Sequence, residues 1–95
     1  MKLEIDSVLK TISGNEWTIL VVSRSGEIRE VIPLHSIPDL EVVEAIGKRN
    51  RGCAFRGLPR SNVTESELKE IVQDLVDTIE YAKTHKLKAG TNIPK

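Results

Sequence analysis

The chain has 95 residues, which is enough for one small domain, and its 14 basic and 14 acidic residues balance to a formal charge of zero. Because proteins that coat duplex DNA usually carry a basic excess, this balance argues against a general DNA-binding protein. The single cysteine, Cys53, excludes an intramolecular disulfide, and no apolar run approaches the ~20 residues that span a bilayer. The first residues also lack the apolar run of a signal peptide, so we expect a cytoplasmic protein without membrane contact.

The first third of the chain predicts three β-strands. Residues 2–12 alternate imperfectly between apolar and polar, as in a bulged strand. Residues 16–24 carry apolar side chains at odd and even positions, which predicts a central strand covered on both faces. Residues 24–27 form a hairpin signal, and a third strand over residues 27–33 ends at a proline. Together these segments predict an antiparallel three-stranded meander.

A short helix is predicted to follow Ser36, whose hydroxyl can accept a hydrogen bond from the first turn, with Asp39 adding a favourable charge to that turn. An apolar side chain recurs every three residues along it: Ile37, Leu40, Val43 and Ile46. The helix is expected to weaken at Gly47, since glycine is a poor helix former.

A long C-terminal helix is the best-defined element of the sequence. Thr64 and Glu67 have the spacing of a capping box. From Leu68 to Ile79 apolar residues follow the i, i+3, i+4, i+7 rule without a break. Acidic residues fill the first turn and basic residues the last, as the helix dipole favours.

These elements predict an α+β fold, with two helices packed on one face of the sheet. We expect a single domain over residues 1–86 and a C-terminal tail over residues 87–95. Because the central strand is apolar on both faces, one face would meet water unless a second subunit covered it. The sequence therefore predicts a homo-oligomer.

The central segment, residues 47–63, is the candidate functional region. It lies in a gap without acidic residues between Glu44 and Glu65, and it holds several arginines and the only phenylalanine. Arginine forks bind phosphate oxygens, and an aromatic ring can stack on a base. The predicted ligand-binding residues are Arg49, Arg51, Phe55, Arg56, Arg60 and Asn62. The alternative is a solvated basic loop, with the phenylalanine filling the core and the arginines pairing with the acidic last helix.

Catalytic and metal-binding patterns are not apparent. The glycines of the central segment do not have the spacing of a P-loop or of a dinucleotide fingerprint. Cys53 has basic neighbours that would lower a thiol pKa, and His35 is the nearest candidate base, but no motif surrounds either residue. Cys53, His35 and His85 lack metal-ligand spacing. We therefore expect no enzyme activity, no cofactor and no metal.

In element order over residues 3–85, the chain resembles the small phage-encoded sponges of the Thoeris anti-defence type, and the segment RGCAFRGLPRSN, residues 51–62, holds the residues that could play that family's binding roles. Members of that family assemble into oligomers. Arg, Phe and Asn side chains at their subunit boundaries bind a cyclic ADP-ribose-like signal or a cyclic oligonucleotide without converting it. The resemblance implies these roles for Arg51, Phe55, Arg56, Arg60 and Asn62.

The expected function is therefore non-enzymatic sequestration of a phosphorylated, nucleotide-type small molecule, such as a cyclic nucleotide or ADP-ribose immune signal. Two alternatives remain open. One is a protein–protein inhibitor or adaptor that acts through the acidic face of the last helix, where Glu70, Asp74 and Asp77 lie. The other, less favoured, is a small binder of single-stranded nucleic acid.

Overall fold

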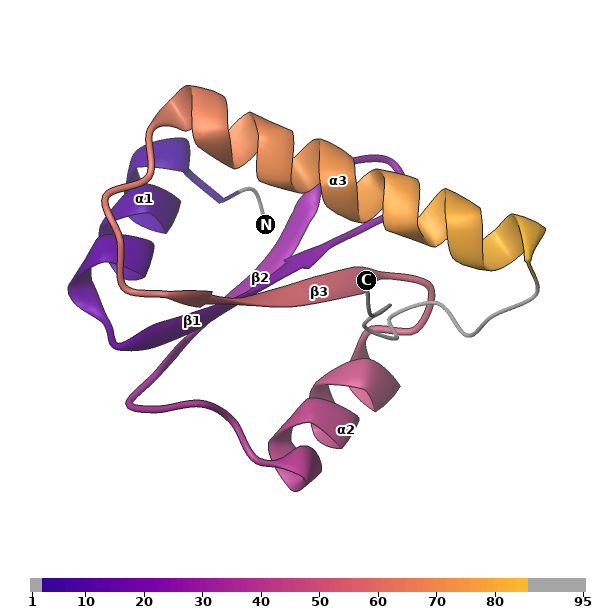
Figure 1. The fold of residues 1–95 in the computed structure, drawn as a ribbon, viewed down its shortest axis with the longest axis horizontal. Coiled ribbons are helices and arrows are strands. Elements are labelled where there is room, and N and C mark those ends of the chain that lie inside the picture. The colour runs from indigo at the N-terminus through magenta and orange to yellow at the C-terminus, as the bar shows by residue number, and fades with distance from the viewer. Residues whose placement is uncertain (1–2, 86–95) are drawn as a thin grey trace.

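The fold is a three-stranded sheet between two layers of helices, described for residues 3–85 by a computed structural model (Figure 1). The strands are antiparallel and stand in the order β2-β1-β3. Along the chain the elements are α1 (Ile5–Gly14), β1 (Trp17–Val22), β2 (Ile28–Leu34), α2 (Leu40–Arg49), β3 (Ala54–Pro59) and α3 (Glu65–Thr84). The α+β class, the three antiparallel strands, the short helix and the long C-terminal helix are as predicted.

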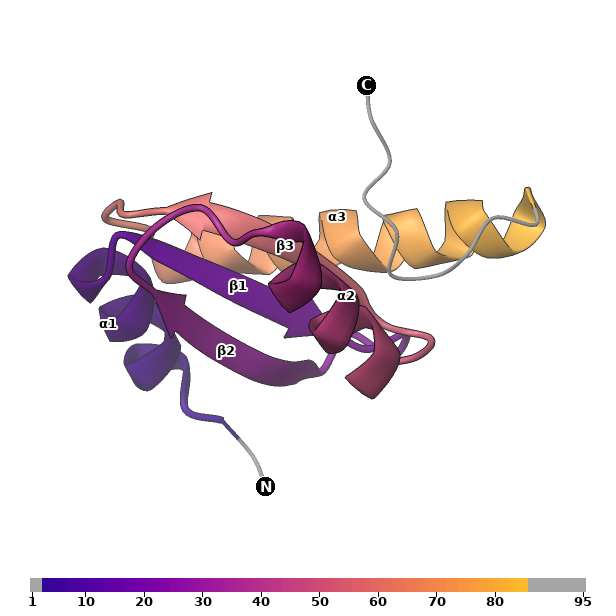
Figure 2. The same cartoon turned by 90° about the horizontal axis from the view of Figure 1, so that it is seen from below.

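Strand β1 is the central strand, and its two faces serve two different cores. Leu20 and Val22 pack with α1 and α3, while Ile19 and Val21 pack with α2. In Figure 2, α2 lies in front of the sheet and α3 lies behind it. The prediction that this strand is covered on both faces is confirmed, but helices of the same chain supply the cover. This strand therefore needs no second subunit to cover it.

The expectation of a first strand over residues 2–12 is wrong, because this segment forms helix α1. Its apolar residues Ile5, Val8 and Ile12 follow the i, i+3, i+7 spacing of one helix face. Val8 and Ile12 are buried in the core under α3. The imperfect alternation of the segment was thus a helical period and not a bulged strand.

The third strand of the sheet is β3, which lies inside the segment predicted to be a loop. It pairs with β1 on the side opposite β2, so that Val21 stands beside Phe55 and Leu20 beside Arg56. The sheet is therefore not a meander of three consecutive strands. The predicted helix layer is also corrected, because α1 and α3 lie on one face of the sheet and α2 on the other (Figure 1).

Helix α2 begins three residues later than predicted. Asp39, not Ser36, is its N-cap, and the Asp39 carboxylate accepts a hydrogen bond from the Val42 backbone N–H at 3.0 Å. Pro38 explains the shift, because a proline disfavours helical backbone at the residue before it. Ile37 consequently lies outside the helix.

The predicted capping box of α3 is confirmed. The Thr64 hydroxyl accepts from the Glu67 N–H at 3.1 Å, and the Glu67 carboxylate accepts from the Thr64 N–H at 2.9 Å. We expect Thr64→Ala to lower the free energy of unfolding by about 1 kcal/mol, since it leaves a helix N–H without its partner. Urea denaturation checks this, with Ser66→Ala as the control, because Ser66 is exposed and makes no cap. An equal loss in both variants would contradict the capping role.

Among residues 3–85, no helix is both long enough and apolar enough to span a bilayer.

Candidate functional site

The structure does not bring the six predicted ligand-binding residues together. Side chains alternate between the two faces along a strand. Phe55 faces α2, whereas Arg56, beside Leu20, faces α3. Arg60 and Asn62 follow the end of β3, and Arg49 and Arg51 precede its start. One ligand cannot contact the ring of Phe55 and the guanidinium of Arg56 from one side of the sheet.

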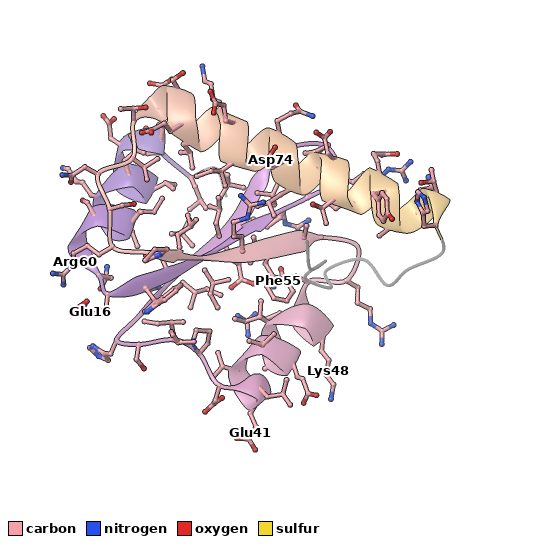
Figure 3. The ribbon with its side chains drawn as sticks, in the orientation of Figure 1. Glu16, Glu41, Lys48, Phe55, Arg60 and Asp74 are labelled. Atoms are coloured by element: carbon pink, nitrogen blue, oxygen red, sulfur yellow. The ribbon has the colours of Figure 1, made fainter. Side chains whose placement is uncertain are left out.

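Phe55 is half-buried as part of the core beneath α2. It packs with Ile19, Val21 and Ile46. A Cβ placed on Gly47 of α2 would lie 3.8 Å from the phenylalanine ring, so the helix backbone passes close to it. In Figure 3, Phe55 lies between β3 and α2. The ring is therefore committed to packing and is a poor platform for a base.

Three of the predicted arginines form ion pairs with carboxylates of this chain. Arg49 binds Glu30 at 3.0 Å. Arg56 lies 3.9 Å from Asp74 of α3, and Arg60 lies 3.4 Å from Glu16. Figure 3 shows the Arg60–Glu16 pair at the end of the sheet away from Phe55. Such exposed pairs are weak, but they give these arginines a structural use.

The structure does gather basic residues at one end of the molecule, around the C-terminus of α2. We call this surface the basic end, and it consists of Arg29, Lys48, Arg49 and Arg51. Two of these residues, Arg49 and Arg29, act on the carboxylate of Glu30. Arg49 contacts Glu30 through two hydrogen bonds of 3.0 Å. The charge of Arg29 also acts on Glu30 and on Cys53.

Glu30 is held as a carboxylate by its neighbours. The hydrogen bond from Arg49 lowers the pKa of Glu30, burial opposes this, and a 2.7 Å hydrogen bond from the Asn50 side-chain amide lowers it further. Asn50 is itself buried, and its amide also donates to the Ile46 carbonyl at 3.0 Å. The cluster therefore fixes the end of α2 against β2.

This arrangement predicts an acid-dependent loss of stability. Since the folded-state pKa of Glu30 lies below its ordinary value of 4.5, its contribution is fully present above that value. It is lost as the pH falls through the folded-state pKa. We expect Glu30→Gln to destabilise the protein at pH 7 and to flatten the decline of unfolding free energy toward pH 3.

Denaturant unfolding at several pH values measures this decline. Glu70→Gln is the matched control, because Glu70 is exposed and makes no ion pair within the described residues. If both variants keep the wild-type pH profile, Glu30 does not have the role described.

Arg29 was not among the predicted site residues, although it belongs to the basic end. Arg29 lies in β2, 20 residues before Arg49 along the chain, and only the packing of α2 onto β2 brings the two together. The signal that could have found it is the neighbouring Glu30. A partly buried carboxylate on a strand under a helix favours cationic neighbours, and Arg29 is next to it in the sequence.

Cys53 is buried, and burial raises the pKa of its thiol, while the nearby Arg29 opposes the rise. A thiol with a raised pKa is a poor nucleophile, so its packing role is favoured over a catalytic one. Within the described part of the chain, no group of three His, Cys, Asp or Glu side chains is placed to hold a metal ion.

The acidic face of α3 is largely engaged in contacts within this chain. All but Glu70 of its acidic side chains have a cap, ion-pair or hydrogen-bond partner among residues 3–85. These pairs are Glu65–Lys69, Thr64–Glu67, Arg56–Asp74, Gln73–Asp77 and Arg24–Glu80. A partner protein would have to compete with these contacts.

A shallow groove of about 280 Å³ lies between α1 and the edge strand β2. Arg29 and Glu30 line one side of it, and Ser7 and Thr11 of α1 line the other. The groove therefore opens beside the basic end, and none of the six predicted residues lines it.

Fold and charge pattern together define a small α+β domain with one basic end. Comparison with protein-family models, curated proteins and solved structures found no match. Its function is therefore inferred from the chemistry of the residues themselves.

Proposed function

We propose that this protein is a non-enzymatic binding protein that holds a phosphorylated small molecule at the basic end. The observation that carries the proposal is the cluster of four cationic side chains near the C-terminal end of α2, of which only Arg49 forms an ion pair among the described residues, with Glu30. A single carboxylate neutralises only part of that charge. An anionic ligand would neutralise the remaining positive charge.

Arg51 is the side chain best suited to contact such a ligand. It is exposed and forms no ion pair within residues 3–85. A guanidinium offers paired N–H donors to phosphate oxygens, and each charge-assisted bond contributes about 1.5–3 kcal/mol. Gly52 follows Arg51 with a φ of 80°, and nothing lies within 4 Å of a Cβ placed there. Its backbone is therefore open to close approach by a ligand.

Nucleotide signals are the first ligands to test, since the resemblance to phage-encoded anti-defence sponges points to cyclic nucleotides and ADP-ribose-type molecules. In this proposal the protein acts in the cytoplasm by sequestration. The phosphates are held by the basic end at the C-terminus of α2. Phe55 has no stacking role here, because its ring is packed under α2.

A thermal-shift screen tests the proposal. The panel consists of inorganic pyrophosphate, mononucleotides, cyclic nucleotides and ADP-ribose, at low and at physiological salt. A ligand at one hundred times its Kd stabilises the folded state by about 2.7 kcal/mol, which raises the melting temperature of so small a domain by several degrees. A shift that falls with salt supports the proposal, and no shift with any member of the panel contradicts it.

We also propose that the protein self-associates. Support comes from two large apolar side chains, Ile37 and Leu40, which stay exposed in the single chain. Sedimentation velocity at micromolar concentrations tests this point separately from ligand binding. A single monomer species up to 100 µM, roughly 1 mg/ml in a protein of 10.6 kDa, would contradict it.

A further inference from the structure

The N-terminal part of α2 and the segment just before it carry an apolar surface that the other described residues, within 3–85, do not cover. Leu40 is 71% exposed and Ile37 is 69% exposed, whereas Ile46, farther along the same predicted stripe, is 2% exposed. Val43 is half-buried between them. The apolar stripe of α2 therefore enters the core at its C-terminal end and leaves it at its N-terminal end.

Helix α2 is also divided by charge. Its N-terminal half carries Asp39, Glu41 and Glu44, and its C-terminal half carries Lys48 and Arg49. Figure 3 shows Glu41 and Lys48 extending from α2 away from the sheet. A helix with this division complements a copy of itself that runs in the opposite direction, because each acidic half then lies beside a basic half.

We propose that the occupant of this surface is a second copy of the chain, with the two α2 helices packed antiparallel about a two-fold axis. This assignment rests on the self-association proposed above and specifies its interface. The antiparallel direction also pairs the opposite ends of the two helix dipoles. A parallel arrangement would instead place acid beside acid and base beside base.

Helical spacing decides which side chains meet. Leu40 and Gly47 are seven residues apart, so they lie on nearly the same side of α2, with Val43 beside the line that joins them. In an antiparallel pair, Leu40 of one copy lies over Gly47 of the other. Gly47 has no side chain to keep the leucine away from the α2 backbone, and the Phe55 ring lies close by, so we take this position, the notch of the interface, to receive the leucine.

The flanking charges follow from the same register. Glu41 and Lys48 are also seven residues apart, on the outer flank of the helix, so each Glu41 lies beside the Lys48 of the other copy. The two copies of Glu44 lie near the two-fold axis. Each is four residues from Lys48 on its own helix, which partly offsets their mutual repulsion.

Sedimentation velocity of the full chain tests the apolar part of the interface. We expect a dimer for wild type and a monomer for Leu40→Glu, because the change places a charge in the notch of the other copy. Tyr81→Glu is the control, since Tyr81 is 47% exposed on α3 and lies outside the proposed interface. It should remain dimeric. Circular dichroism of Leu40→Glu should match wild type, because the side chain is exposed in the single chain.

Charge reversal tests the direction of packing. Lys48→Glu should weaken the dimer on the order of tenfold, and the double variant Glu41→Lys with Lys48→Glu should restore it to near the wild-type Kd. A dimer that survives Leu40→Glu overturns this interface while leaving self-association intact. Absence of rescue overturns the antiparallel arrangement, and a monomeric wild type overturns both proposals.

Discussion

Replacing Leu20 with alanine is expected to lower the free energy of unfolding by about 3 kcal/mol. Leu20 is completely buried in the central strand and belongs to the larger core, which includes Val8 and Ile12 of α1 and Leu68 of α3. Truncation removes the transfer free energy of the side chain and leaves a cavity between rigid elements. In a domain of this size, such a loss is a large part of the total stability.

Equilibrium denaturation in urea measures the change, with Leu9→Ala as the matched control. Leu9 lies at the margin of the same core and is only partly buried. Its truncation should cost about half as much, because less area is removed from water. Equal losses at the two positions would contradict the assignment of Leu20 to the centre of the core.

The double variant Arg29→Gln with Arg51→Gln is expected to weaken ligand binding by about a hundredfold or more. Each arginine supplies a charge-assisted hydrogen bond to phosphate, and loss of one costs about 1.5 kcal/mol or more when the site is partly exposed. Both side chains are exposed, so their removal should leave the fold intact.

Calorimetric titration checks this result, with the strongest ligand from the thermal-shift screen and with inorganic pyrophosphate. The control is Arg56→Gln with Arg60→Gln, which changes the net charge by the same amount at residues that pair with Asp74 and Glu16. The control should bind like wild type. Equal weakening of both variants would indicate a general charge effect. Weakening of the control alone would place the ligand site at Arg56 and Arg60 instead of the basic end.

Local patterns in the sequence predicted some elements well. The central strand, the hairpin after it and the capping box at Thr64 each depend on residues close together along the chain. These elements were confirmed. Helix α1 was misread because Leu3 and Ile5 alternate like strand residues, whereas Ile5, Val8 and Ile12 follow the helical period.

The site was harder to predict, because its residues come from segments far apart in the sequence. Phe55 and Arg56 are adjacent in the chain, yet pairing of β3 with β1 places them on opposite faces of the sheet. Arg29 and Arg49 are distant in the chain and approach one another only through Glu30. A run of basic residues shows where positive charge is abundant. Only the tertiary structure shows which of those charges share one surface.

Mapping the ligand by NMR is the most direct test of the basic end. Backbone amide shifts of the labelled protein are followed while ADP-ribose, or the strongest ligand from the screen, is added. We predict that the largest changes cluster at Arg29 and Glu30 of β2 and at residues 48–52. Changes centred on residues 60–62 or along α3, or no change at saturating ligand, would contradict the account.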